Sequence, residues 1–282
     1  MKGIEQQLKE YTRLTDGKLE EIFAGSEMSP ILRESMSYSV FAGGKRLRPA
    51  LCMGACELLG GRAEDAVLPA CAVEMIHAYS LIHDDLPALD NDDLRRGKPS
   101  NHKAFGEANA IIAGDGLQAL AFLVAAKTGN PKVVDALATG AFDMVVGQSY
   151  DLVGGSDAAM LNTIHRLKTG ALIKAAVLSG GHCGKATKAE LAGLSDFAEK
   201  FGLLFQITDD ILDATGDAEQ LGKSIGKDAK EDKLTFVTLY GVDGARLQAK
   251  KTAEQAHKTV DGFGERSGFF HGLVDMTLDR RA

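Results

Sequence analysis

The sequence predicts an all-α protein, and three observations support that prediction. Apolar residues gather in segments of helical length, and Gly or Pro residues separate one segment from the next. Residues that favour helix caps stand at several segment starts. No segment shows the sustained alternation of apolar and polar residues that is typical of strands, so we expect no strands. The chain also carries no internal repeat, linker or low-complexity tract, and we therefore expect one domain over residues 1–282.

Individual helices follow from capping and breaking residues. The first predicted helix begins at Ser29-Pro30, since Ser is a good N-cap and Pro suits the first helical position, and it ends at Gly43-Gly44. A later helix follows the capping box Thr187-Lys188-Ala189-Glu190 and extends to about residue 214. Ser156 or Asp157 can cap a helix that contains Lys168. Two or three shorter helices complete the chain. The other helices are expected at about 49–59, 64–85, 107–127 and 132–153, with loops at 86–103 and 215–233.

Composition and charge disfavour several classes of protein. The chain has 282 residues, of which 45% are hydrophobic, and this is enough for a substantial core. Its net charge of −7 disfavours nucleic-acid binding. The four cysteines are too scattered to suggest a disulfide framework, and we expect small buried residues. The N-terminus lacks signal or transit character, and the apolar stretch 110–126 is interrupted by Asp115 and Gln118. We therefore expect no membrane insertion and a cytoplasmic protein.

Two acidic clusters interrupt apolar segments. The first contains Asp84, Asp85 and Asp90, and the second lies at residues 209–213. In the second cluster the outer aspartates are i,i+4 neighbours on one helix face, where like charges repel unless a cation lies between them. Carboxylates at the end of an apolar helix also face an unfavourable helix dipole. Mg²⁺ takes oxygen ligands and is commonly shared between carboxylates and phosphates, so both clusters indicate a metal site.

Positive residues also occur in clusters, and most of these clusters lie next to glycine. They are found in Gly43-Gly44-Lys45-Arg46-Leu47-Arg48-Pro49, in Arg95-Arg96-Gly97-Lys98, in Lys168-Thr169-Gly170, and at Lys223, Lys227, Lys230 and Lys233. Guanidinium groups pair with phosphate oxygens, and glycine allows close approach of the backbone. Because acidic and basic clusters alternate along the chain, we interpret them as one site for metal and phosphate rather than as a solubilising surface.

These segments resemble the trans-isoprenyl diphosphate synthases, and look closest to the bacterial short-chain farnesyl diphosphate synthases. The resemblance covers about residues 25–240, with the motifs in the same order. Besides the clusters above, it rests on residues 76–87, 105–110, 206–208 and 221–223. It implies a single large helical bundle of the isoprenoid synthase type around a central prenyl-chain cavity. It also implies a homodimer that binds isopentenyl diphosphate and allylic diphosphates.

The resemblance implies a role for each matching residue. The metal ligands would hold three Mg²⁺ ions, for which Mn²⁺ can substitute; these ligands are Asp84, Asp85, Asp90, Asp209, Asp210 and Asp213. Isopentenyl diphosphate would bind to Lys45, Arg48, His77 and Arg96, and the allylic diphosphate to Arg95, Lys168, Lys223 and Lys233. The residues expected to act in catalysis are Lys168, Thr169, Gln206 and Arg95. Residues 227–235 depart from the family pattern, so Lys227 and Lys230 are alternatives to Lys233.

The implied reaction is the head-to-tail (1′-4) condensation of isopentenyl diphosphate with dimethylallyl and then geranyl diphosphate, giving farnesyl diphosphate. Tyr79 and Ser80 are the candidates for control of chain length. Tyr79 lies five residues before Asp84, roughly 7.5 Å lower on a helix. In the family, a bulky aromatic residue here accompanies the fifteen-carbon product. Ser80 rather than Tyr79 shares the i,i+4 stripe with Asp84, so the ring must lean across.

Four other interpretations are open. The nearest is a geranylgeranyl diphosphate synthase. An HD-type metal phosphohydrolase is suggested by His83-Asp84, but that fold needs further His and Asp ligands, and this interpretation leaves the second acidic cluster unexplained. A class I terpene cyclase would carry a second metal motif with Asn, Ser and Glu. A non-catalytic subunit of a heteromeric synthase would typically lack one of the two aspartate motifs.

Overall fold

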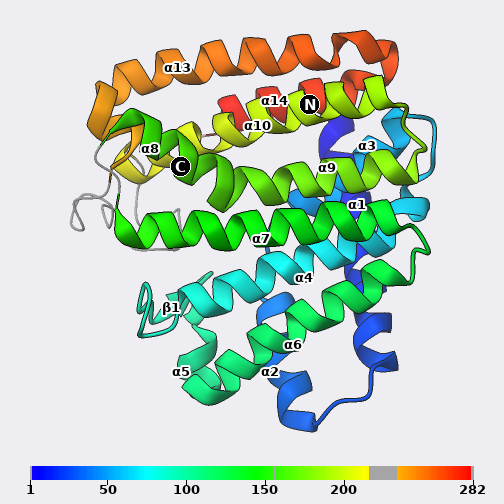
Figure 1. Ribbon diagram of the computed structural model, residues 1–282, viewed down its shortest axis with the longest axis vertical. Coiled ribbons are helices and arrows are strands. Elements are labelled where there is room, and N and C mark those ends of the chain that lie inside the picture. The colour runs from blue at the N-terminus through cyan, green and yellow to red at the C-terminus, as the bar shows by residue number, and fades with distance from the viewer. Residues whose placement is uncertain (1, 155–156, 216–233, 281–282) are drawn as a thin grey trace.

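The computed structural model describes residues 2–154, 157–215 and 234–280, and these residues form a bundle of helices (Figure 1). The first half of the chain contains α1 (Lys2–Gly25), α2 (Pro30–Val40), α3 (Leu47–Leu58), the 3₁₀ turn η1 (Ala63–Ala66), α4 (Val67–Asp84), α5 (Asn101–Phe105) and α6 (Glu107–Ala126). The second half contains α7 (Pro131–Val153), α8 (Ala158–Ile164), the π-helical turn η2 (His165–Gly170), α9 (Ala171–Cys183), α10 (Lys188–Thr215), α13 (Phe236–Val260), the 3₁₀ turn η3 (Asp261–Ser267) and α14 (Gly268–Leu278). The predicted all-α class is confirmed.

The bundle has α4, α7, α9 and α10 as neighbouring helices around one core, with α13 across α10 (Figure 1). The core contains large buried side chains such as Met75, Ile76, Leu117, Phe197 and Phe201. α4 and α10 each bring an aspartate cluster to the same end of the bundle, because both helices finish there. The two clusters therefore lie at the same end of the bundle although the sequence separates them by more than 100 residues.

Several predicted helix boundaries agree closely with the structure. Ser29 caps α2 by accepting a hydrogen bond from the backbone N–H of Leu32, with Pro30 at the first position. Asp157, rather than Ser156, accepts the N–H of Met160 at the start of α8. The Thr187–Glu190 capping box is present before α10, where the Glu190 carboxylate accepts from the Thr187 backbone N–H at 2.7 Å. Local capping chemistry determines these starts, and the sequence therefore predicts them.

Other expectations about the fold were wrong or incomplete. The helix α1 was not predicted, although Tyr11, Thr15, Leu19 and Phe23 form a buried i,i+4 stripe along it. α13 is longer than the short C-terminal helices expected, and it turns at Gly241, whose φ is 68°. The expected loop 86–103 contains a two-stranded antiparallel hairpin, β1 (Leu94–Arg95) and β2 (Lys98–Pro99). The expected loop 215–233 lies outside the described residues, apart from the last residue of α10.

Two helices in the described part of the chain are long and apolar enough to cross a membrane by length and composition. They are the segment Ala63–Asp84 and the helix α6, whose most apolar windows are 67% and 44% buried within the bundle. The core helix of a soluble protein passes the same test. The helix α6 is 20 residues long, so length and composition by themselves do not test the expected absence of membrane insertion.

Candidate active site

The first aspartate cluster lies at the C-terminal end of α4. Residues of the apolar body of this helix, including Met75 and Ile76, are buried, and they carry Asp84 and Asp85 into the bundle end. Asp85 is 2% exposed. Burial raises the pKa of Asp84 to about 6 because the charged form loses water. The backbone N–H of Asp90 donates to the Asp84 carbonyl at 2.8 Å, so the loop after α4 folds back over the cluster.

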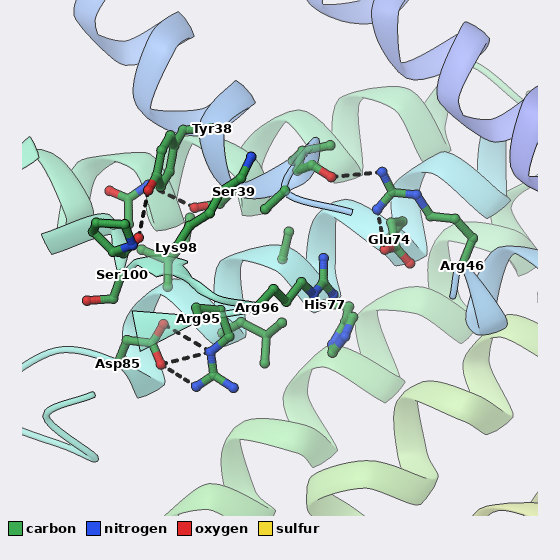
Figure 2. Close-up of a pocket in the computed structure, with 17 residues that line it drawn as sticks. Tyr38, Ser39, Arg46, Glu74, His77, Asp85, Arg95, Arg96, Lys98 and Ser100 are labelled. Atoms are coloured by element: carbon green, nitrogen blue, oxygen red, sulfur yellow. Dashed lines mark hydrogen bonds and ion pairs between the residues drawn. The ribbon is translucent and has the colours of Figure 1, made fainter. Parts of the chain in front are cut away.

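The hairpin formed by β1 and β2 delivers Arg95 to this cluster. The Arg95 Nε donates to both carboxylate oxygens of Asp85 at 3.1 Å, and a third contact joins Nη2 to the same group (Figure 2). Asp92 lies 3.7 Å from the same guanidinium. Arg95 is thus placed where the acidic cluster meets the basic cluster, a position that suits the contact with the allylic diphosphate implied by the family resemblance.

A dense positive cluster lies beside Arg95. Burial first, and then the charges of Arg48 and Arg96, depress the pKa of His77 well below its ordinary value. Burial likewise lowers the pKa of Arg48, and its Nε is buried without a hydrogen-bond partner among the described residues. Arg96 reaches the Gly43 carbonyl, and a Cβ on Gly44 would lie 2.9 Å from its guanidinium, so this glycine is needed for the contact. Buried cations with unused donors favour an anionic ligand.

The second aspartate cluster lies at the end of α10. Asp210 and Asp213 are 8% and 9% exposed. The backbone N–H of Phe236 donates to Asp210 at 2.7 Å, so one carboxylate oxygen caps the start of α13. Asp209 lies 3.9 Å from the guanidinium of Arg280. Asp210 therefore combines a structural contact with its expected role as a metal ligand, since the second oxygen of a carboxylate can bind a cation.

The turn η2 links the two clusters. Lys168 donates to Asp151 at 2.7 Å, and the positive charge of Lys168 acts on Asp84 across the bundle end. The Thr169 hydroxyl donates to Gln206 at 2.7 Å, which connects η2 to α10. The structure therefore brings together Lys168, Thr169 and Gln206, the three residues that the family resemblance implies would face the allylic carbon. The π-helical geometry of this turn is typical of functional sites and was not predicted.

Three residues near the site were missed by the sequence analysis. Asp151 is the ion-pair partner of Lys168, His165 lies 3.8 Å from Asp210, and Arg280 lies between Asp209 and the ring of Phe205. Burial lowers the pKa of His165 to about 4. Asp151 could have been found from the sequence, because a carboxylate near a helix C-terminus faces an unfavourable helix dipole, as Asp84 does. Nothing in the local sequence indicated His165.

Other predicted site residues are found as follows. Lys45 lies within electrostatic reach of Asp209 and Arg280, so it faces the second aspartate cluster as well as the positive cluster. Tyr79 is 6% exposed, and its ring meets His83 edge to face at a centroid distance of 5.9 Å. The Ser80 hydroxyl donates to the backbone carbonyl of His77 at 2.9 Å. Lys223, Lys227, Lys230 and Lys233 lie outside the described residues.

The donor set fits a hard divalent cation shared with a ligand. Among the described residues, no group of three or more His, Cys, Asp or Glu side chains is arranged to hold a metal by itself. The carboxylates instead lie at the ends of two helices, with Asp85 and Asp210 already in protein contacts. Mg²⁺ is usually held by one or two carboxylates together with substrate phosphates, which matches this distribution. His83 contacts the Ile111 carbonyl at 3.1 Å, which does not support the HD-type interpretation.

The family follows from comparison with known proteins. A family model described as "Polyprenyl synthetase" matches residues 29–264. The chain belongs to the polyprenyl synthetase family. It is 46% identical over 249 residues to a chloroplastic geranylgeranyl pyrophosphate synthase of Capsicum annuum, covering 84% of this chain and 68% of the relative. It is 47% identical over 262 residues to a dimethylallyltranstransferase of Fischerella ambigua (strain UTEX 1903), covering 88% of this chain and 76% of the relative.

Solved structures of polyprenyl synthetases agree with the fold. An FPP/GFPP synthase from Zymomonas mobilis superposes with a TM-score of 0.86 at 34% identity, covering 98% of this chain and 99% of that one. A polyprenyl synthase from Caulobacter crescentus, complexed with calcium and isoprenyl diphosphate, gives a TM-score of 0.88 at 26% identity, covering 98% of each chain. The predicted family is confirmed. Membership assigns the chain to the divalent-metal-dependent prenyltransferases that elongate trans-prenyl chains.

Proposed function

We propose that this polyprenyl synthetase condenses isopentenyl diphosphate with dimethylallyl and then geranyl diphosphate, and releases farnesyl diphosphate. The observation that carries the proposal is the junction at Arg95. There an acidic helix end meets a buried positive cluster, in which the Arg48 Nε has no hydrogen-bond partner among residues 2–154, 157–215 and 234–280. Two diphosphates can bind side by side at such a junction, one with metal beside Asp84 and Asp85, the other on guanidinium groups alone.

We assign the positive cluster to isopentenyl diphosphate. Arg48, His77 and Arg96 lie close to one another, and Figure 2 shows His77 and Arg96 between the Arg95–Asp85 and Arg46–Glu74 ion pairs. The depressed pKa of His77 makes the imidazole neutral at pH 7, so it can donate one hydrogen bond without adding charge. Lys45 lies in the loop just before α3, the helix that contains Arg48. The diphosphate supplies the anion that this cluster needs.

The allylic diphosphate is assigned to the two aspartate clusters with Arg95 and Lys168. Mg²⁺, in three ions held by Asp84, Asp85, Asp90, Asp209, Asp210 and Asp213, would supply neutralisation of the departing diphosphate. Lys168 carries a positive charge beside the same group, and Thr169 and Gln206, which are joined by a hydrogen bond, would face the allylic carbon. The buried apolar helices exclude water from the reacting carbon. The released diphosphate accepts the proton, so no side chain acts as the base.

Chain length is assigned to Tyr79. Its ring is buried on α4 five residues before Asp84, and its hydroxyl lies close to Gln118 of α6, so the ring can form a floor for the growing prenyl chain. Geranylgeranyl diphosphate is the second candidate product, because the relative from Capsicum annuum is named as a synthase of that compound. The size of the residue at position 79 decides between the two products in this proposal.

Product analysis tests the proposal. Purified protein with isopentenyl diphosphate, dimethylallyl diphosphate and Mg²⁺ should give farnesyl diphosphate. Tyr79→Ala should extend the product to geranylgeranyl diphosphate or longer, while the matched control Tyr79→Phe, which keeps the ring, should not. Both variants are assayed below their melting temperatures, since loss of a buried aromatic ring costs about 3–5 kcal/mol. An unchanged product distribution from folded Tyr79→Ala would favour a different length determinant. No turnover by the purified protein would favour the non-catalytic subunit.

A second copy of the chain is proposed as the partner, in a cytoplasmic protein without membrane insertion. α6 and α7 pack against each other and expose large apolar side chains, among them Ile112 at 55%, Leu123 at 62%, Phe142 at 68% and Val145 at 51%. Exposed apolar surface of this kind, beside the polar Asp115, is typical of a protein interface. Covering this surface in a homodimer removes the apolar face of α6 from water.

A further inference from the structure

Arg46 is a buried arginine next to the positive cluster, and the assignments above give it no role in binding. It is 4% exposed and adopts a left-handed backbone conformation with φ of 44°, just before α3. Gly43 and Gly44 before it also have positive φ angles, of 93° and 135°. A left-handed arginine is strained and persists only where its surroundings hold it. The contacts of its side chain therefore stabilise Arg46 in this strained backbone conformation.

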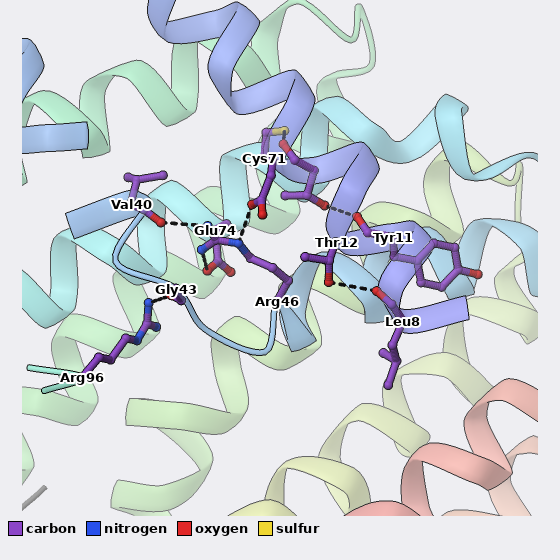
Figure 3. A network of polar contacts seen from close by, with 11 residues as sticks. Leu8, Tyr11, Thr12, Val40, Gly43, Arg46, Cys71, Glu74 and Arg96 are labelled. Atoms are coloured by element: carbon purple, nitrogen blue, oxygen red, sulfur yellow. Dashed lines mark hydrogen bonds and ion pairs between the residues drawn. The ribbon is translucent and has the colours of Figure 1, made fainter. Parts of the chain in front are cut away.

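Three parts of the fold hold the Arg46 guanidinium (Figure 3). It donates to Asp16 of α1, to Glu74 of α4 and to the Val40 carbonyl at the end of α2, each at 2.8 Å. The pair with Glu74 is nearly dry, since the two side chains are 3% and 5% exposed, whereas Asp16 is 38% exposed. Arg46 and Glu74 are thus a desolvated ion pair, in which each charge depends on the other.

Glu74 lies among cations that the proposed reaction needs. It lines one cavity together with His77 and Arg96, and the only other carboxylate lining that cavity, among the described residues, is Asp85. Asp85 is engaged by Arg95. The negative charge of Glu74 acts on both Arg48 and Arg96. Glu74 is therefore an internal anion close enough to compete with a diphosphate for these guanidinium groups.

We propose that Arg46 is a positioning residue that holds Glu74 and so prevents this carboxylate from pairing with Arg48 and Arg96. Both guanidinium groups then stay available for the diphosphate of isopentenyl diphosphate. The proposal rests on the assignment of the positive cluster to that substrate. Without Arg46, a buried carboxylate loses its partner and takes the nearest cation, since an uncompensated charge in a dry site is strongly unfavourable. Arg48, whose Nε has no hydrogen-bond partner in the described part of the chain, is the available one.

Steady-state kinetics separate this competition from a purely structural role. Arg46→Met should raise the KM for isopentenyl diphosphate about tenfold or more, while the KM for the allylic primer changes less than about twofold. The double variant Arg46→Met/Glu74→Gln removes both charges and should return the KM for isopentenyl diphosphate to within about threefold of the wild-type value. Glu74→Gln alone should not raise that KM, because it removes the competing anion.

Control variants keep the test decisive. Arg33→Met removes another partly buried arginine, which donates to the Phe23 and Ser26 carbonyls and is not among the described residues that line the cavity. It should lower thermal stability without changing either KM. Arg46→Lys retains the charge beside Glu74 but loses the fork to Asp16 and Val40. Arg46→Lys should therefore be less stable but keep the wild-type KM for isopentenyl diphosphate. If Arg46→Met does not fold, the KM of Arg46→Lys is the value that tests the proposal.

Three results would overturn the proposal. They are an unchanged KM in folded Arg46→Met, a double variant whose KM stays as high as that of Arg46→Met, and a tenfold rise in the KM of Arg46→Lys. Failure of the proposed function is recognised separately, because the wild-type protein would then show no turnover of isopentenyl diphosphate. In that case calorimetric titration with inorganic diphosphate applies the same comparison, with weaker binding expected in Arg46→Met and recovery in the double variant.

Discussion

Gly147 on α7 should control the position of Lys168 and Thr169. A Cβ built on Gly147 would lie 2.2 Å from the backbone N of Lys168 and 2.6 Å from its Cα. Ordinary contact begins at 3.4 Å, so Gly147→Ala requires a separation of 3.4 − 2.2 = 1.2 Å between α7 and η2. The added Cβ is fixed by the backbone of Gly147 and meets backbone atoms of Lys168, so no side-chain rotation can relieve the contact. The shift therefore moves the turn that carries Lys168.

The expected effects of Gly147→Ala differ in size for stability and for turnover. Overpacking of this kind costs about 1–3 kcal/mol, partly offset by the better helix propensity of alanine, about 1 kcal/mol. A displacement of about 1 Å in a catalytic group can cost about 10²-fold in rate. We therefore expect a melting temperature lower by a few degrees and kcat per folded molecule lower by about 10²-fold. Thermal unfolding and steady-state turnover with both substrates measure the two effects.

Two glycine variants serve as matched controls. Gly17→Ala lies in α1, where a Cβ meets nothing within 4 Å, and should leave turnover unchanged with equal or higher stability. Gly140→Ala lies on the same helix as Gly147, where a Cβ would approach Ala175 Cβ at 2.5 Å, and should lower stability with turnover per folded molecule retained. If Gly147→Ala behaves like Gly140→Ala, the backbone position of Lys168 does not limit the reaction, and the reasoning fails.

Three further predictions concern metal, pH and assembly. Chelation with EDTA should abolish turnover and added Mg²⁺ should restore it, whereas full activity in excess chelator would contradict a metal role for the aspartates. In metal-free protein the raised pKa of Asp84, about 6, means that stability falls as pH rises from about 4 to 6, since the folded state holds the proton longer than the unfolded state. Urea unfolding across this range should show a flatter dependence in Asp84→Asn; an equal slope would assign the effect elsewhere. Light scattering at micromolar concentration should give twice the mass of one chain for the wild-type protein and the mass of a single chain for Leu123→Glu. A monomeric mass for the wild-type protein would contradict the proposed dimer.

Much of the site could be predicted because its chemistry is local in sequence. Asp84 and Asp85 stand out at the end of an apolar helix, and the Gly43-Gly44 turn beside Lys45 indicates close approach of a ligand. The same local reasoning missed Arg280, which reaches Asp209 from the far end of the chain. Arg46 was visible only as one more cation beside Arg48. Its partners in α1, α2 and α4 are distant in sequence, so no spacing rule could distinguish an ion-paired arginine from a ligand-binding one.

The sequence by itself determined the helical class, most helix boundaries, the two aspartate clusters and the family, because capping, periodicity and charge clustering are properties of neighbouring residues. Only the tertiary structure decided which charges neutralise each other inside the protein and which stay available to a substrate. Glu74 is paired with Arg46, Asp85 with Arg95 and Lys168 with Asp151. Arg48 keeps a donor, its Nε, that has no partner among the residues that the structure describes. These pairings join separate helices, and electrostatic energy depends on distance and burial in three dimensions rather than on order along the chain.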